Sequence, residues 1–119
     1  FVDKMLINMR KGKNLKIAGD RIDSPSYALT ISMKIKKILK KKRYGIYHLS
    51  DKGVVSYYQF IKELSENVSF KGKVIKAKDS DFPSSAPNPL RVPMSSKNGT
   101  GFFWKKALKM YIRNEKVEC

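Results

Sequence analysis

The chain has 119 residues and a strongly basic composition, in which 26 Lys and Arg against ten Asp and Glu give a formal charge of +16. Its length is that of one domain, and a hydrophobic content of 41% is too high for a disordered tail. No apolar run approaches the roughly 20 residues of a membrane span, so we expect no membrane partner. A single Cys and a single His exclude a disulfide framework and a Cys/His zinc site.

The first predicted element is a helix at the start of the chain. Four apolar residues recur at i, i+3, i+4 and i+7 on one helical face: Val2, Met5, Leu6 and Met9. The pattern stops at Gly12, a usual residue just beyond a helix end. Because the sequence opens on Phe1, without an initiator Met or a capping residue, we expect it to be part of a longer protein. Charged residues interrupt the first apolar positions, which predicts no secretory signal and a cytoplasmic location.

A strand, a loop and a second helix are predicted next. Apolar and polar residues alternate over Leu15–Ala18, and the turn formers that follow indicate a loop over Gly19–Ser26. A helix from about Ser26 to Lys42 carries its apolar residues on one side: Tyr27, Ile31, Ile35, Ile38 and Leu39. Lysines crowd its other faces and its C-terminal end, where cations interact favourably with the helix dipole.

The middle of the chain predicts two strands around a third helix. Ile46–Leu49 places β-branched and aromatic residues on both faces, which is typical of a covered central strand. Ser56, followed three residues later by Gln59, forms a capping-box pattern that opens a helix running to about Val68. The buried side of this helix is predicted to hold Tyr57, Phe60, Ile61 and Leu64. Lys73–Lys78 alternates again as a short strand.

The last third of the chain consists of a loop and a final helix. Residues 82–93 contain four prolines, which predicts an extended loop. Helical spacing returns in the apolar residues of the last segment: Trp104, Ala107, Leu108 and Tyr111. The sequence thus predicts an α/β chain of about four helices and three short strands, without an internal repeat.

Two patterns that could indicate catalysis are interpreted as structural. Tyr58 and Lys62 have the Tyr-x-x-x-Lys spacing of short-chain dehydrogenases, but any helix with these residues four apart produces it. The Gly-x-Gly-x-x-Gly turn that cradles a dinucleotide is absent. His48 is expected to be a strand residue and Asp51 a loop-initiating acid. We therefore predict no catalytic, cofactor-binding or metal-binding residue in this chain.

The better candidates for ligand binding lie in two loops. Arg21 offers a bidentate donor for phosphate or carboxylate, and Ser24 and Ser26 place hydroxyls beside a helix N-terminus. Arg91 belongs to the proline-rich loop, whose limited flexibility lowers the entropy lost when it closes over a ligand. We predict these four side chains as substrate-binding residues.

The order of these segments resembles the C-terminal half of dTDP-4-dehydrorhamnose reductase, in the extended short-chain dehydrogenase/reductase superfamily. In that family a loop of the type D-Q-x-G-x-P-T precedes a helix, a G-I-Y-H strand and an S-W-Y-E-F helix start. The corresponding segments here are Asp20–Ser26, Gly45–His48 and Ser56–Phe60. A Pro-rich loop and a W-x-x-A-L helix close the family pattern, as Trp104–Leu108 does here. Arg21, Asp23, Ser26 and Asn88 depart from the family's usual Gln, Gly, Thr and Arg.

The resemblance implies that residues 1–119 form the substrate-binding portion of a Rossmann-type reductase. An N-terminal portion, absent from this sequence, would bind NADPH, carry the catalytic Tyr and Lys and pack against the apolar faces of this chain. The implied reaction reduces the C4 ketone of dTDP-4-dehydro-L-rhamnose in dTDP-rhamnose synthesis. This chain alone should then be inactive and poorly soluble. The whole protein would bind a nucleotide sugar and could form a homodimer.

Two other functions stay open at this point. The regulatory β subunit of methionine adenosyltransferase, a non-enzymatic relative, has a similar sequence pattern. A basic nucleic-acid-binding module would also account for the charge, since lysines that neutralise phosphates give salt-dependent affinity. Arginine is scarce at five residues and no base-reading motif is present, so we do not expect nucleic acid as a partner.

Overall fold

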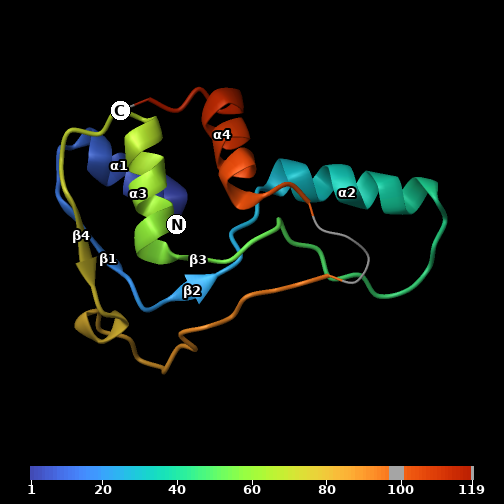
Figure 1. Ribbon diagram of the computed structural model, residues 1–119, viewed down its shortest axis with the longest axis horizontal. Helices are drawn as coiled ribbons and strands as arrows, with labels where there is room; N and C mark the ends of the chain where they lie inside the picture. Colours follow the sequence, from blue (N-terminus) through green and yellow to red (C-terminus); the bar gives the residue numbers. More distant parts are fainter. Residues whose placement is uncertain (97–100, 119) are drawn as a thin grey trace.

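The computed structural model describes residues 1–96 and 101–118, which form helices and short strands. In chain order the elements are α1 (Val2–Arg10), β1 (Leu15–Ala18), β2 (Ile22–Asp23), α2 (Ala28–Lys40), β3 (Val55–Ser56), α3 (Tyr57–Asn67), β4 (Val74–Ala77), the 3₁₀ turn Asp79–Asp81 and α4 (Trp104–Asn114). Figure 1 shows α1, α3 and α4 gathered into one body, from which α2 extends away. None of the described helices is both long and apolar enough to cross a membrane.

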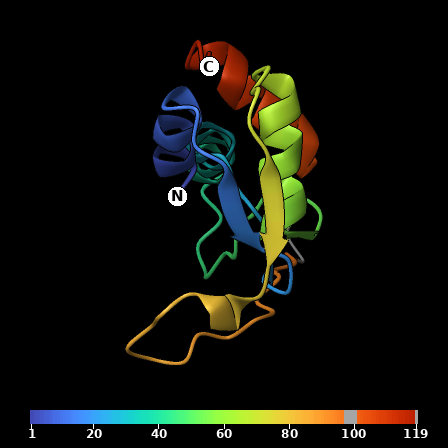
Figure 2. The same cartoon turned by 90° about the vertical axis from the view of Figure 1, so that its left-hand side faces the viewer.

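The strands form two small ladders. β1 and β4 pair in parallel, with Leu15 opposite Val74 and Ala18 opposite Ala77. Figure 2 shows these two strands side by side, and α1 and α3 pack against β1. β2 and β3 pair antiparallel over two residues each. This second ladder holds the start of α3 beside the loop that precedes α2.

The core forms where the helical stripes meet β1. α3 contributes Ile61 and Leu64, whose side chains are completely buried. Around them pack buried residues of the other elements: Leu6 and Met9 from α1, Leu15 and Ile17 from β1, and Trp104 and Leu108 from α4. The apolar spacing predicted from the sequence is confirmed for α1, α3 and α4, because each stripe faces this cluster.

Most predicted elements are confirmed, with boundaries within a few residues. α3 begins at Ser56, whose side chain accepts a hydrogen bond from the Gln59 amide at 3.1 Å. Residues 82–93 form neither helix nor strand, as their prolines predict. β2 and β3 were not predicted; two residues are too few for an alternation to be visible, and β2 lies inside the predicted loop Gly19–Ser26.

The predicted central strand over Ile46–Leu49 is wrong for this chain. These residues have no strand assignment, and the side chain of Ile46 is 87% exposed. His48 is exposed as well, so it is not the sheet residue that we expected. A strand needs a neighbour to satisfy its backbone groups, and none of the described strands lies beside this segment.

The apolar side of α2 is also uncovered. Thr30 is its one buried residue, whereas Ile35 is 44% and Leu39 71% exposed. α2 makes no more than marginal contact with any other described helix or strand. Residues 46–49 and α2 therefore carry the apolar pattern of buried elements, although they lie at the surface of this chain.

Candidate functional site

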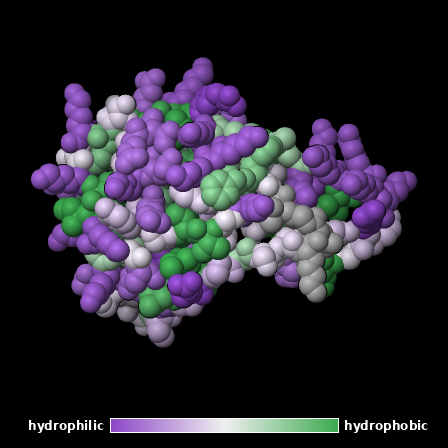
Figure 3. Space-filling model, in the orientation of Figure 1, coloured by the Kyte–Doolittle hydropathy of each residue, from purple (hydrophilic) through white to green (hydrophobic). Residues whose placement is uncertain are grey.

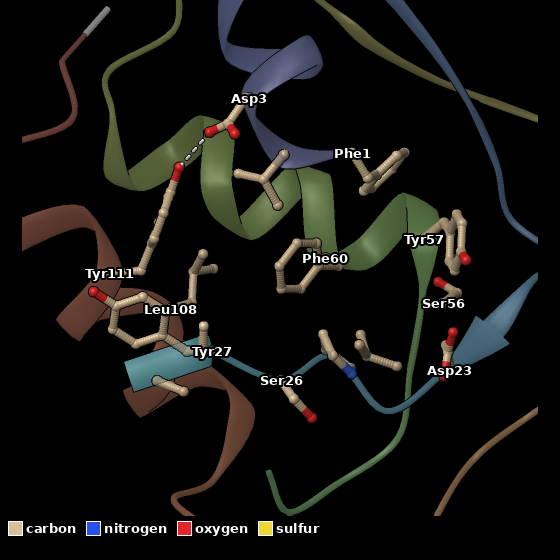
Figure 4. Close-up of a pocket in the computed structure, with 15 residues that line it drawn as sticks. Phe1, Asp3, Asp23, Ser26, Tyr27, Ser56, Tyr57, Phe60, Leu108 and Tyr111 are labelled. Carbon is tan, nitrogen blue, oxygen red and sulfur yellow. Dashed lines mark hydrogen bonds between the residues drawn. The ribbon is translucent and has the colours of Figure 1, made fainter. Parts of the chain in front are cut away.

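A pocket of about 460 Å³ opens between the helices of the body and the segment before α2. Figure 4 shows it bordered by the first residues of α1, the start of α3, the middle of α4 and the turn into α2. Five aromatic side chains line it: Phe1, Tyr27, Tyr57, Phe60 and Tyr111. Its polar groups lie toward the rim and come from Asp3, Asp23, Ser26 and Ser56. Such a combination of apolar walls and a few polar groups is typical of sites for small organic ligands.

The aromatic rings are arranged at the two ends of the pocket. At one end the Phe1 and Tyr57 ring centroids lie 5.1 Å apart with a tilt of 45°. At the other end Tyr27 and Tyr111 meet edge to face at 5.5 Å. Aromatic rings along a pocket suit a planar heterocycle, because offset and tilted stacking are the favoured aromatic geometries.

Carboxylates hold the two tyrosines at the second end. Tyr111 donates a hydrogen bond to Asp3 Oδ1 at 2.9 Å, and Tyr27 donates to Glu115 Oε1 at 3.1 Å. Burial and, after it, the bond to Asp3 raise the pKa of Tyr111 from 10.0 to about 12. Burial and the bond to Glu115 also raise the pKa of Tyr27. Both phenols therefore stay protonated at neutral pH and act as donors to these acids.

Arg21 lies beside the pocket and is held by two neighbours. Its Nε is 3.5 Å from Asp79 Oδ1, and its guanidinium carbon lies 4.9 Å from the centre of the Tyr57 ring. The Arg21 carbonyl accepts a hydrogen bond from the Tyr57 amide at 2.9 Å, which fixes its backbone at the start of α3. Its side chain is 27% exposed, so the guanidinium stacks on a ring of the pocket wall without lining the pocket itself.

The two predicted serines hold the loop that forms one wall. Ser24 Oγ accepts from the Met94 amide at 3.0 Å and donates to the Met94 carbonyl at 3.4 Å. Ser26 lines the pocket, and its Oγ accepts from the Asp51 amide at 2.9 Å. Each hydroxyl thus has a structural partner within the chain, and Ser26 is the one predicted site residue among those that line the pocket.

The proline-rich loop runs beside β2. Ile22 donates to the Leu90 carbonyl at 2.7 Å and accepts from the Val92 amide at 3.0 Å. Arg91 lies between Leu90 and Val92 in the sequence, and it is exposed. The structure therefore places Arg21 and Arg91 next to the same short strand, with Arg91 outside the pocket.

Asp51 is a buried residue whose importance the sequence analysis missed. Its side chain is completely buried and accepts hydrogen bonds from the Tyr27 amide at 2.8 Å, from Thr30 Oγ1 and from the Phe102 amide at 3.1 Å. It thus joins the start of α2, which lines the pocket, to the segment before α4. A Cβ on Gly101 would collide with its Oδ1. One signal was available: Asp51 is the single acid in residues 24–62.

Tyr58 and Lys62 occupy a different face of α3. They border a smaller hollow beside β4, of about 240 Å³, and neither lines the aromatic pocket. The described residues contain no group of three His, Cys, Asp or Glu side chains that could hold a metal ion. The Tyr-x-x-x-Lys match therefore lies away from the site that the fold builds.

Four helices, short strands and a pocket lined by aromatic side chains define the class of this chain as an α/β lobe. The comparisons agree. The chain belongs to the RmlD substrate binding domain family, whose model matches residues 1–116. It is 24% identical to the spore coat polysaccharide biosynthesis protein SpsK of Bacillus subtilis, covering all of this chain and 44% of that protein.

Solved structures give the same result. A dTDP-4-dehydrorhamnose reductase from Clostridium acetobutylicum matches with a TM-score of 0.89 and 26% identity, over 98% of this chain and 44% of that one. The enzyme from Bacillus anthracis, solved in complex with NADP, matches with a TM-score of 0.88 and 23% identity, over 96% and 43% of the two chains. The chain thus spans less than half the length of these relatives and has the fold of their C-terminal portion. The predicted resemblance is confirmed, and the regulatory and nucleic-acid alternatives are not favoured.

Proposed function

We propose that this chain is the nucleotide-sugar-binding portion of an NADPH-dependent dTDP-4-dehydrorhamnose reductase. The observation that supports this most directly is the aromatic pocket with Arg21 stacked on its wall, in a chain of the RmlD substrate binding domain family. In this proposal the whole protein reduces the C4 ketone of dTDP-4-dehydro-L-rhamnose. The chain supplies binding and orientation rather than the redox step.

The binding groups are assigned by matching chemistry. The thymine ring stacks against the exposed faces of Phe1 and Tyr57, since a planar base is recognised by aromatic rings. Arg21 turns from Asp79 to the diphosphate; this ion pair is partly solvated and contributes little, so exchanging the partner costs little. Ser24 and Ser26 shape the wall, and Arg91 approaches the phosphates from the proline-rich loop.

The cofactor is assigned to an N-terminal portion outside this chain. NADPH would supply the hydride, and holding its pyrophosphate requires a Gly-rich turn that this sequence lacks. No Lys or Arg is among the residues that line the aromatic pocket, and the two arginines beside β2 are already assigned to the substrate. Residues 1–119 therefore carry no cofactor site in this proposal, and the chain alone is inactive.

The same N-terminal portion would cover the uncovered apolar elements. Ile31, Ile35 and Ile38 share one face of α2, and Ile46 follows in an extended segment that has no strand neighbour. A sheet contributed by the N-terminal portion would accept this segment as a strand and bury the helix face against it. This arrangement explains why the sequence pattern of residues 46–49 predicts a strand that the chain alone does not form. A cytoplasmic location and a homodimer remain predictions for the whole protein.

The test is a calorimetric titration of dTDP and dTDP-rhamnose into the full-length protein and an Arg21→Ala variant. Loss of a charge-assisted contact costs about 1.5 to 3 kcal/mol, so affinity should fall by about 10-fold to 150-fold. Arg113→Ala, at an exposed position in the last turn of α4, is the matched control and should bind as the parent does. Equal affinity of parent and Arg21→Ala would remove Arg21 from the site. No binding of either ligand to the parent would contradict the proposed function.

A further inference from the structure

The C-terminal end of α2 carries a dense cluster of cations. Seven positive side chains fall within ten residues: Lys34, Lys36, Lys37, Lys40, Lys41, Lys42 and Arg43. No Asp or Glu occurs anywhere in residues 24–50. At about 1.5 Å of rise per helical residue, this charge is concentrated within roughly 15 Å. Figure 3 shows hydrophilic side chains gathered over this end of the molecule.

These cations differ from the others in their density and in the absence of a nearby acid, because residues 24–50 contain no Asp or Glu. On the body, Lys105 pairs with Glu63 at 3.2 Å, Arg21 pairs with Asp79, and Lys76 and Lys106 lie over aromatic rings. Among the described residues, no ion pair or ring contact involves a side chain of the α2 cluster. Seven like charges in one place repel one another, so the surface favours an external polyanion.

Helix geometry places two residues of this cluster, Lys36 and Lys40, on the side of α2 away from the face assigned to the N-terminal portion. Leu29, Met33, Lys36 and Lys40 follow one another at i, i+4, i+7 and i+11 and so share one side of α2. The isoleucine face begins two residues later, about 200° around the helix. Leu29 and Met33 are 40% and 43% exposed. The outer face of α2 therefore presents two apolar side chains followed by lysines, and it stays free when the isoleucines are covered.

We propose that this outer face of α2 binds an anionic membrane surface. Clusters of four to eight Lys and Arg on an amphipathic helix match the negative potential of acidic phospholipids, and apolar side chains on that face enter the boundary of the acyl chains. Six of the seven cations are Lys. Lys binds as a point charge, whereas Arg provides the planar recognition that nucleic acids favour. A surface contact of this kind requires no membrane-spanning helix. The proposal therefore replaces the earlier expectation of no membrane partner, which rested on the absence of a spanning segment.

The experiment is co-sedimentation of the full-length protein with phosphatidylcholine vesicles and with vesicles containing about a third phosphatidylglycerol. The test variant combines Lys36→Gln, Lys37→Gln, Lys40→Gln and Lys41→Gln. A matched variant removes four exposed lysines of the body, Lys11, Lys13, Lys71 and Lys109, by the same substitution. Both variants have the same net charge, so their comparison isolates the position of the charges.

We expect the parent protein to bind the anionic vesicles only, with a partition coefficient that falls as salt is added. In the α2 variant this partition coefficient should fall by at least about tenfold. The body variant should keep its partitioning within about twofold. Equal loss in both variants, or no binding of the parent at low ionic strength, overturns the proposal. Single-stranded DNA is titrated in parallel; tight DNA binding that the α2 variant loses, with no vesicle binding, would assign the surface to nucleic acid instead.

Discussion

Asp51 joins three segments of the chain through one buried carboxylate. Replacing it by Ala leaves the amides of Tyr27 and Phe102 without their acceptor, whereas the Thr30 hydroxyl can still donate to the Tyr27 carbonyl at 2.7 Å. We expect Asp51→Ala to lower the free energy of opening of this region by about 3 kcal/mol, since unsatisfied buried donors and broken buried networks carry costs of that order. Amide hydrogen exchange of Tyr27 and Phe102 measures it. Glu66→Gln, at an exposed position, is the control, and unchanged protection in Asp51→Ala would show that the carboxylate holds nothing together.

Tyr111 makes the stability of the folded state depend on pH in the alkaline range. Because folding raises its pKa from 10.0 to about 12, the folded state favours the neutral phenol. The resulting stability is complete below pH 10 and is lost as the pH rises toward 12. Tyr111→Phe should flatten the fall in stability between these values, as measured by thermal unfolding at a series of pH values. Asp3→Asn should shift the phenolate absorbance of Tyr111 to lower pH; an unshifted titration would contradict the role of Asp3.

At the scale of elements, the start of α3 depends on one cap. Ser56 Oγ accepts from the Gln59 amide, and the helix it opens carries the two completely buried core residues Ile61 and Leu64. Ser56→Ala should cost about 1 kcal/mol, the usual value of an N-cap. Thermal unfolding and the exchange rate of the Gln59 amide report it. Ser85→Ala in the exposed proline-rich loop should change stability by less than about 0.5 kcal/mol.

For the whole molecule, the isoleucine face of α2 distinguishes the chain alone from the full-length protein. Ile35→Ser with Ile38→Ser should reduce self-association and dye binding of the isolated chain, because it removes exposed apolar surface. The same pair should destabilise the full-length protein by about 3 kcal/mol or more, because there the face is covered. Leu29→Ser with Met33→Ser, on the opposite face, should leave the full-length protein stable. Equal effects of the two pairs on full-length stability would show that the N-terminal portion does not cover the isoleucines.

Local patterns in the sequence predict the elements because the chemistry that forms them is local. The stripe of Val2 and Met9, the Ser56 cap and the prolines of residues 82–93 each act within a few residues, and each is confirmed. The pairing of β2 with β3 joins residues more than 30 apart and leaves no periodic signal. Asp51 looks like an ordinary loop acid for the same reason, since its donors come from Tyr27, Thr30 and Phe102.

The sequence by itself determined the family resemblance, the order of the four helices with β1 and β4, the net charge and the loops that carry Arg21, Ser26 and Arg91. Only the tertiary structure decided that Ser26 lines an aromatic pocket, that Arg21 stacks on Tyr57 and that Arg91 lies outside the pocket. It also decided that residues 46–49 remain unpaired in this chain. The physical reason is that apolar and capping patterns specify an element, whereas its neighbours depend on contacts between residues far apart in the sequence.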